Sequence, residues 1–208
     1  MSDVTAVRDP ERDSLLTPRN SVLALIDYQP EQYTGVGSVG HEELLHHVTM
    51  LGKVATAFDL PVVLSTVYVK HGMSGTNPEL REALPGVPEI DRTTLNSWED
   101  PDFREAVERT GRKNLILAGL WTEVCVAFPA LDAIAAGYRV FIVADAIGGV
   151  SRAAHESAML RMTQAGATPI TVLGLACELQ RDWGRPGADR LRGVMREYFS
   201  GMRSLRQK

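Results

Sequence analysis

The chain has 208 residues, of which 44% are hydrophobic and 23% charged, and its formal net charge at pH 7 is −4. This length allows one domain with a large core, and the acidic balance gives no electrostatic reason to expect nucleic acid or an anionic membrane as a partner. The polar first residues and the absence of a long apolar run predict neither a secretory signal nor a membrane span. Two cysteines, Cys125 and Cys177, cannot build a disulfide framework. We therefore expect a cytoplasmic protein that acts on a small molecule.

Short apolar runs alternate with amphipathic stretches along most of the chain. The runs predict strands at 21–26, 61–68, 87–91, 115–118, 139–144 and 168–173. The stretches between and after them predict helices at 41–58, 78–84, 102–109, 123–136 and 151–165, around residue 177, and at 188–208. This alternation predicts an α/β protein with a three-layer α/β/α, Rossmann-like fold and a mostly parallel six-stranded sheet.

The two ends of the chain differ from its middle. Residues 1–20 are polar and are interpreted as an N-terminal arm, whereas 21–184 hold the strands and helices of the main domain. Residues 185–208 predict an amphipathic helix with a basic outer face. Packing on the domain itself or on a neighbouring subunit suits this helix better than a membrane, because the whole chain is acidic. The arm and this helix together predict a homo-oligomer.

Cys125 lies in the first turn of a predicted helix that follows a buried strand. Open α/β sheets bind ligands at that place, and a helix N-terminus favours a thiolate. A buried and inert cysteine fits the same position equally well. Cys177 lies in an apolar stretch and is interpreted as structural, and the adjacent His46 and His47 are interpreted as surface residues.

Two charged residues are candidates to act with Cys125. Asp27 ends the first strand, where it is either a site carboxylate or a turn cap. Burial that raises its pKa would suit Asp27 as the base for the thiol. Arg92 would stabilise the ionised pair, but it cannot pass a proton because it stays charged. With backbone amides near Cys125 as an oxyanion hole, this set predicts acyl transfer through a thioester.

Longer strings of residues carry a resemblance to a known family. The string GLWTEVCV at 119–126 resembles the nucleophile motif of the isochorismatase-like cysteine hydrolases. Asp27-Tyr28-Gln29 is similar to their first-strand Asp-x-Gln, and the residues at 143–146 are similar to their strand-ending Asp-Ala. The similarity spans 20–184 and is strongest to the YcaC-like subgroup, through VCVAFPAL at 124–131 and ACELQRDW at 176–183.

The resemblance implies an Asp, Lys, Cys triad in which Asp27 is the base and Cys125 the nucleophile. The family lysine precedes an aromatic residue by six positions, and here Arg92 occupies that place before Trp98. This departure puts efficient amide turnover in doubt more than thioester chemistry, because arginine does not shuttle protons.

The resemblance also implies a cis peptide between Leu120 and Trp121, and an oxyanion hole formed by the amides of Trp121 and Cys125. Nicotinamidase members of the family bind a metal through Asp-x-His after the second strand. This chain has the sequence YVKH at 68–71 instead, so we expect no metal and no cofactor.

The expected function is a cysteine-dependent hydrolase that cleaves a C–N bond of a small amide, carbamoyl or imide substrate through a thioester. One alternative is isochorismatase-type hydrolysis that does not need the cysteine. Another is a catalytically idle oligomer with a redox-sensitive thiol. The residues expected to line the substrate pocket are Tyr28, Gln29, Trp98, Phe128 and Ile147.

Overall fold

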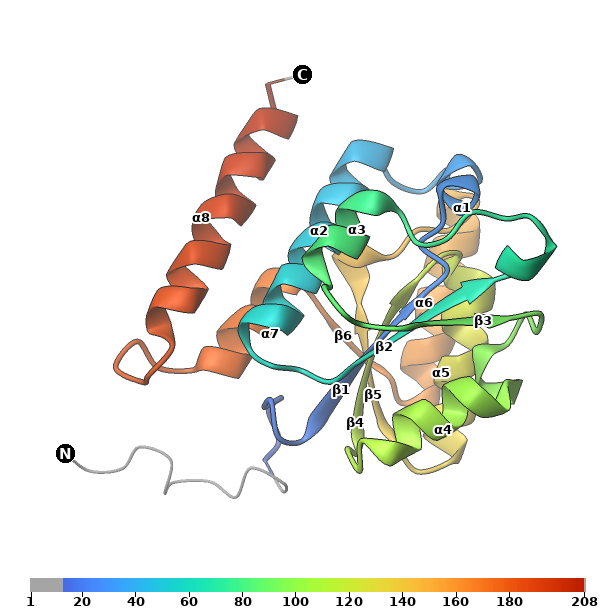
Figure 1. The fold of residues 1–208 in the computed structure, drawn as a ribbon, viewed down its shortest axis with the longest axis horizontal. Coiled ribbons are helices and arrows are strands. Elements are labelled where there is room, and N and C mark those ends of the chain that lie inside the picture. The colour runs from blue at the N-terminus through green and yellow to red at the C-terminus, as the bar shows by residue number, and fades with distance from the viewer. Residues whose placement is uncertain (1–12, 208) are drawn as a thin grey trace.

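The computed structural model describes residues 13–207. Within this range six strands form one sheet in the order β3-β2-β1-β4-β5-β6, and every pair of neighbours is parallel (Figure 1). The strands are β1 (Ser21–Ile26), β2 (Val62–Val67), β3 (Glu89–Arg92), β4 (Asn114–Gly119), β5 (Arg139–Val143) and β6 (Thr168–Ile170). The predicted six-stranded sheet is confirmed, and it is wholly rather than mostly parallel.

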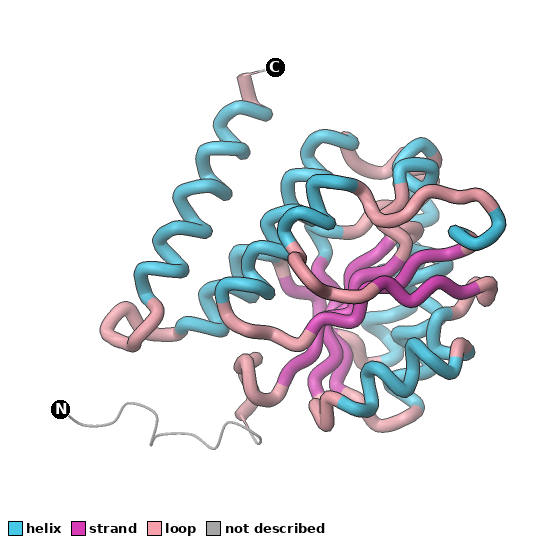
Figure 2. Tube along the Cα trace, in the orientation of Figure 1, coloured by secondary structure: helices cyan, strands magenta, loops and turns pink. Residues whose placement is uncertain are grey.

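Helices cover both faces of the sheet, as Figure 2 shows. One layer consists of α2 (His41–Ala57), α3 (Pro78–Ala83), α7 (Val172–Gln180) and α8 (Ala188–Leu205), and the other of α4 (Pro101–Arg109), α5 (Ala127–Ala135) and α6 (Arg152–Ala165). Five short helical turns complete the described chain: α1 (Pro30–Thr34), η2 (Val69–His71), η3 (Ser97–Glu99), η4 (Thr122–Val126) and η5 (Ala144–Ala146). The predicted three-layer α/β/α fold is therefore confirmed. No helix between residues 13 and 207 is long and apolar enough to cross a bilayer.

The expected ligand site of such a fold lies at the centre of the sheet, between β1 and β4. Both β1 and β4 are buried at every position, which agrees with their nearly continuous apolar sequences and with helices on both faces. The strand order reverses between these two strands. A crevice opens at such a switch point, outside the carboxyl ends of the strands. Asp27 directly follows β1, and the turn that leads to Cys125 directly follows β4.

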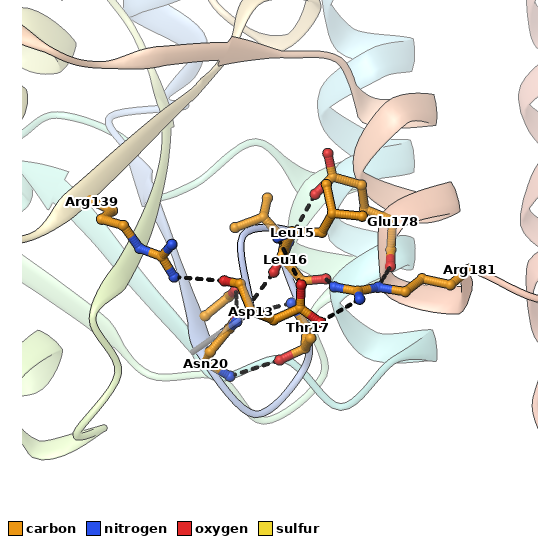
Figure 3. A network of polar contacts seen from close by, with 9 residues as sticks. Asp13, Leu15, Leu16, Thr17, Asn20, Arg139, Glu178 and Arg181 are labelled. Carbon is orange, nitrogen blue, oxygen red and sulfur yellow. Dashed lines mark hydrogen bonds and ion pairs between the residues drawn. The ribbon is translucent and has the colours of Figure 1, made fainter. Parts of the chain in front are cut away.

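Residues 13–20 pack against the body of the protein through a polar network (Figure 3). The guanidinium of Arg181 forms an ion pair with Asp13 and donates a hydrogen bond to the carbonyl oxygen of Leu16 at 3.2 Å. The N–H of Leu16 donates to the carboxylate of Glu178 at 2.8 Å, and Arg139 donates to the carbonyl oxygen of Asp13 at 3.0 Å. This part of the predicted arm is thus attached to α7 of its own chain, whereas 1–12 lie outside the described residues.

Two predictions about single residues are wrong. His47 is only 5% exposed, because α8 folds back over α2; its Nδ1 donates to the carbonyl oxygen of Asp145 at 2.7 Å, and its Nε2 lies 3.3 Å from the hydroxyl of Tyr198. Cys177, which was interpreted as structural because its stretch of sequence is apolar, is exposed on α7. The apolar face of α7 carries Leu175, Ala176 and Leu179, and Cys177 points away from it.

The contact between α2 and α8 gives a testable pair of glycine substitutions. A Cβ at Gly193 would meet nothing within 4 Å, whereas a Cβ at Gly201 would lie 2.2 Å from Cε1 of His46. Alanine is more stable than glycine inside a helix by about 0.5–1 kcal/mol, so Gly193→Ala should stabilise the protein by that amount. Gly201→Ala must displace the His46 ring and its 3.1 Å hydrogen bond to the carbonyl oxygen of Tyr198. We expect Gly201→Ala to destabilise the protein by about 1 kcal/mol or more.

Urea unfolding of the two variants, monitored by circular dichroism, measures these free energies. Equal stabilisation by both alanines would contradict the packing of α8 on α2 through His46.

Candidate active site

Asp27 and Arg92 form a fully buried ion pair at the carboxyl end of the sheet. Both side chains are 0% exposed, and Nη2 of Arg92 donates to Oδ2 of Asp27 at 2.6 Å. Arg92 ends β3, two strands away from β1, so its long side chain spans the width of β2 to reach the carboxylate. Its Nη1 donates to the carbonyl oxygen of Thr94 at 2.5 Å, which fixes the guanidinium in place. Oδ1 of Asp27 is buried and makes no well-formed hydrogen bond to the described residues.

The turn after β4 brings Cys125 to this pair. The Leu120–Trp121 peptide is cis, as expected, and η4 then forms a wide helical turn that leads into α5. Cys125 is 7% exposed and lies beside the carboxylate of Asp27, close enough for each group to change the pKa of the other. The N–H of Trp121 points towards the Cys125 sulfur and favours its ionised form. The fold therefore brings Asp27, Arg92 and Cys125 together.

Burial is the main cause of the pKa shifts of Asp27 and Cys125. Desolvation raises the pKa of Asp27 above its usual value, against the opposing effects of the Arg92 guanidinium and of the neighbouring Cys125 thiol. Burial, together with the negative charge of Asp27, raises the pKa of Cys125 to about 12, although Arg92 and the Trp121 N–H oppose this shift. This direction is opposite to the thiolate that a helix N-terminus alone predicts. The resting site thus holds a neutral thiol beside a carboxylate with raised basicity.

The side chain of Trp121 is fixed from the β1 side of the crevice. Its indole N–H donates to the carbonyl oxygen of Gln32 at 2.8 Å. A Cβ at Gly35 would lie 2.5 Å from Cζ2 of the indole, so only glycine leaves room for the ring there. The loop after β1 and the turn after β4 therefore share one packed contact.

Two residues of the expected pocket use their polar groups inside the fold. The hydroxyl of Tyr28 donates to the carbonyl oxygen of Ala146, and Tyr28 is fully buried. The amide of Gln29 donates to the carbonyl oxygens of Val67 and Ser74 at 2.9 and 2.7 Å and accepts from the N–H of Val67 at 2.9 Å. The amide of Gln29 thus joins the ends of β1 and β2 and has no free group to offer a substrate.

The other three expected pocket residues lie at different places. Trp98 packs edge-on against Tyr138, with ring centroids 5.3 Å apart, and Tyr138 directly precedes β5. This contact places Trp98 towards the amino end of β5, away from Cys125, so we do not assign it to the pocket. Phe128 is partly buried, one helical turn after Cys125, and Ile147 is buried beside the bridge between Leu120 and Gly148.

The segment that holds a metal in nicotinamidases has a different structure here. Tyr68 precedes η2 and His71 is its last residue, and the centroids of their rings lie 4.3 Å apart. The carboxylate of Asp91 accepts hydrogen bonds from the N–H groups of Val69 and Lys70 at 2.9 and 3.0 Å. Between residues 13 and 207 no group of three or more His, Cys, Asp or Glu side chains has the arrangement of a metal site.

The sequence did not predict a contact that lies next to Cys125, between Thr122 and His155. Oγ1 of Thr122 and Nδ1 of His155 are 3.0 Å apart and hydrogen-bonded. His155 belongs to α6 and is half-buried against η4. No periodicity distinguishes His155 from its exposed neighbours, so only the packing of α6 on η4 shows the contact.

Comparison with known proteins gives consistent matches over most of the chain. The isochorismatase domain family matches residues 21–173. YcaC of Escherichia coli K12, described as a probable hydrolase, is 41% identical over 169 residues, which cover 81% of this chain and 81% of that protein.

Two solved structures match nearly the whole chain. The crystal structure of E. coli YcaC, described as an octameric hydrolase of unknown specificity, is 38% identical with a TM-score of 0.86, over 94% of this chain and 96% of that one. The structure of YcaC from Pseudomonas aeruginosa with hexane-2,5-diol and covalent acrylamide is 34% identical with a TM-score of 0.86, over 93% of this chain and 96% of that one.

Proposed function

This chain belongs to the isochorismatase family of hydrolases, in its YcaC-like subgroup, and we propose that it hydrolyses a C–N bond of a small amide, carbamoyl or imide through a thioester on Cys125. Asp27 is the general base, and Arg92 holds that base and stabilises its charge. The amides of Trp121 and Cys125 form the oxyanion hole. No step of this proposal uses a metal or a cofactor.

The proposed reaction moves one proton at each stage. Asp27 takes the thiol proton as the Cys125 sulfur attacks the substrate carbonyl carbon, and the negative charge collects on the carbonyl oxygen. The C–N bond then breaks, and Asp27 returns the proton to the leaving nitrogen, which departs as ammonia or an amine. Water attacks the thioester while Asp27 takes a proton from it. The C–S bond breaks, the acid leaves, and the sulfur regains its proton.

One observation carries the proposal: a carboxylate of raised pKa lies beside a buried neutral thiol. A base whose pKa is closer to that of the thiol takes the proton more easily during attack, so ionisation and bond formation coincide. Arg92 binds Oδ2 of Asp27 and leaves Oδ1 for proton transfer, and it needs no proton exchange for this role. The arginine in place of the family lysine is therefore compatible with the proposed chemistry.

A covalent adduct in the P. aeruginosa relative supports a nucleophilic role for Cys125 in the proposal. Its structure contains covalent acrylamide, and acrylamide is an electrophile that forms bonds with nucleophilic thiols. The octameric E. coli relative supports a homo-oligomeric assembly for this chain as well. In such an assembly we place the 185–208 segment near a subunit contact, because Phe199 within it and Trp183 just before it are exposed.

Trapping of the acyl-enzyme tests the proposal. Incubation with p-nitrophenyl acetate should add one acetyl group to Cys125, detected by mass spectrometry of the acid-quenched protein and of its peptides. The variant Cys177→Ser is the matched control, since it removes the exposed thiol and should leave the adduct unchanged. Acetylation that remains in Cys125→Ala and disappears in Cys177→Ser would contradict a nucleophilic role for Cys125.

A further inference from the structure

Three hydrogen bonds join the turn that holds Cys125 to α6 and to the segment between β5 and α6. The N–H of Thr122 donates to the carbonyl oxygen of Gly148 at 2.9 Å. The hydroxyl of Thr122 is bound to Nδ1 of His155 at 3.0 Å, and the carboxylate of Glu123 accepts from the N–H of Val150 at 3.0 Å. Thr122 is fully buried, so its hydroxyl has no access to solvent.

His155 is the side chain of α6 that reaches this turn. Its burial lowers its pKa below the usual value, against the opposing charges of Glu123 on η4 and Glu156 on α6, so the ring is neutral near pH 7. In the neutral ring with hydrogen on Nε2, Nδ1 accepts the hydrogen bond from the Thr122 hydroxyl. The contact is thus a specific polar bond between a buried hydroxyl and an imidazole.

The space around this bond is filled. A Cβ at Gly149 would lie 2.6 Å from Oε2 of Glu123 and 3.1 Å from Cβ of His155. Because the chain at Gly149 leaves no room for a side chain, neither Glu123 nor His155 can shift towards it without a clash. Glu123, which lies next to Thr122, and His155, which binds it, are therefore packed closely against Gly149.

Thr122 directly follows Trp121, whose N–H points at the Cys125 sulfur. The Trp121 N–H belongs to the cis Leu120–Trp121 peptide, and Thr122 is joined to that peptide through the Cα of Trp121. A shift of Thr122 therefore moves Trp121, and with it the geometry of the proposed oxyanion hole. The side chain of Trp121 is held from the β1 side by the hydrogen bond from its indole N–H to the carbonyl oxygen of Gln32. The Trp121 amide thus depends on contacts with two separate parts of the fold.

We propose that His155 is a positioning residue for the reaction, which acts through Thr122 to aim the Trp121 amide at the oxygen of the tetrahedral intermediate. His155 itself touches neither the substrate nor Cys125 in this role. The inference rests on the proposed function, because it needs acyl transfer to Cys125.

Two reagents separate the proposed role from a general loosening of the fold. Acylation of Cys125 by p-nitrophenyl acetate passes through a tetrahedral oxyanion and releases p-nitrophenolate, whereas alkylation by iodoacetamide displaces iodide without one. We therefore measure the second-order rate constant for acylation divided by the second-order rate constant for alkylation. In His155→Leu this ratio should fall by about 10- to 100-fold, because small misplacements of catalytic groups cost this much.

Two conservative variants of His155 and one surface variant test whether the effect depends on a hydrogen-bond acceptor at the position of Nδ1. His155→Asn places an amide oxygen near the position of Nδ1 and should restore most of the ratio, whereas His155→Gln places it near Nε2 and should not. Glu156→Gln on the same helix breaks an exposed ion pair with Arg152 and should leave the ratio unchanged. An unchanged ratio in His155→Leu, or equal ratios in the Asn and Gln variants, would overturn the inference.

Amide hydrogen exchange tests the role of His155 separately from the proposed function, because it does not depend on acylation of Cys125. The peptide covering 119–126 should exchange faster in His155→Leu than in the parent or in His155→Asn, whether or not Cys125 accepts an acetyl group. If the parent is never acetylated, the proposed function fails. Unchanged exchange in that peptide would by itself overturn the role of His155.

Discussion

Replacing Cys125 by alanine is expected to lower the rate of hydrolysis by at least about 10³-fold, since loss of a nucleophile removes the covalent route and leaves only binding and the oxyanion hole. The measurement is the release of p-nitrophenolate from p-nitrophenyl acetate, followed by ammonia release from a panel of small amides. Cys177→Ala is the control, and the exposed position of Cys177 predicts a change of less than about two-fold.

Full activity of Cys125→Ala would contradict the thioester mechanism. It would instead favour the isochorismatase-type reaction that does not need the cysteine. The variant should fold like the parent, because it removes only one sulfur atom and keeps the Asp27–Arg92 ion pair. Equal unfolding midpoints in urea for Cys125→Ala and Cys177→Ala would exclude a folding defect as the cause of lost activity.

The electrostatics of the site also bear on the redox-sensor alternative. Peroxide reacts with the thiolate, so a cysteine that senses oxidation has a low pKa and is accessible to solvent. Cys125 has neither property, since burial and Asp27 raise its pKa to about 12. A neutral thiol that ionises only when Asp27 accepts its proton suits a reaction in which the substrate is already bound.

Much of the fold follows from patterns within single segments. The apolar runs of β1 and β4 predict central strands, and the spacing of Leu191 and Val194 predicts the buried face of α8. Contacts between distant segments do not follow from such patterns. His47 is buried by Tyr198, which lies more than a hundred residues later in the chain. The end of β6 is set by Thr171, whose hydroxyl accepts from the N–H of Gly174 and begins α7 before the apolar run ends.

The proximity of Asp27, Arg92 and Cys125 was predictable because all three lie where strands of the sheet end. Asp27 and the turn before Cys125 follow the two strands that flank the switch point, and Arg92 ends β3. The direction of the pKa shift of Cys125 was not predictable, because burial raises this pKa more than the helix N-terminus lowers it. The location of Trp98 was not predictable either, since it depends on how η3 packs along α5.

Replacing Arg92 by leucine is expected to move the acid limb of the pH–rate profile to higher pH. The guanidinium opposes the rise that burial causes in the pKa of Asp27, so its removal raises that pKa further. A general base acts only when ionised, and a larger fraction of Asp27 is then protonated at any given pH. The rate of Cys125 acylation by p-nitrophenyl acetate should therefore fall most at low pH and recover in part as the pH rises. Arg92→Lys is the matched control, because it keeps a positive charge and should shift the limb less.

The same substitution should reduce stability in a way that depends on pH. Removing one partner of a buried ion pair leaves the other charge uncompensated and costs about 3–5 kcal/mol. A raised pKa for Asp27 in the folded state means that the folded protein binds a proton more readily than the unfolded chain. Stability of Arg92→Leu should therefore fall as the pH rises through the folded-state pKa, and the deficit relative to the parent should be smaller near pH 5 than near pH 8. Urea unfolding at the two pH values measures this deficit, and a deficit that grows towards low pH would show that Arg92 does not stabilise the ionised form of Asp27.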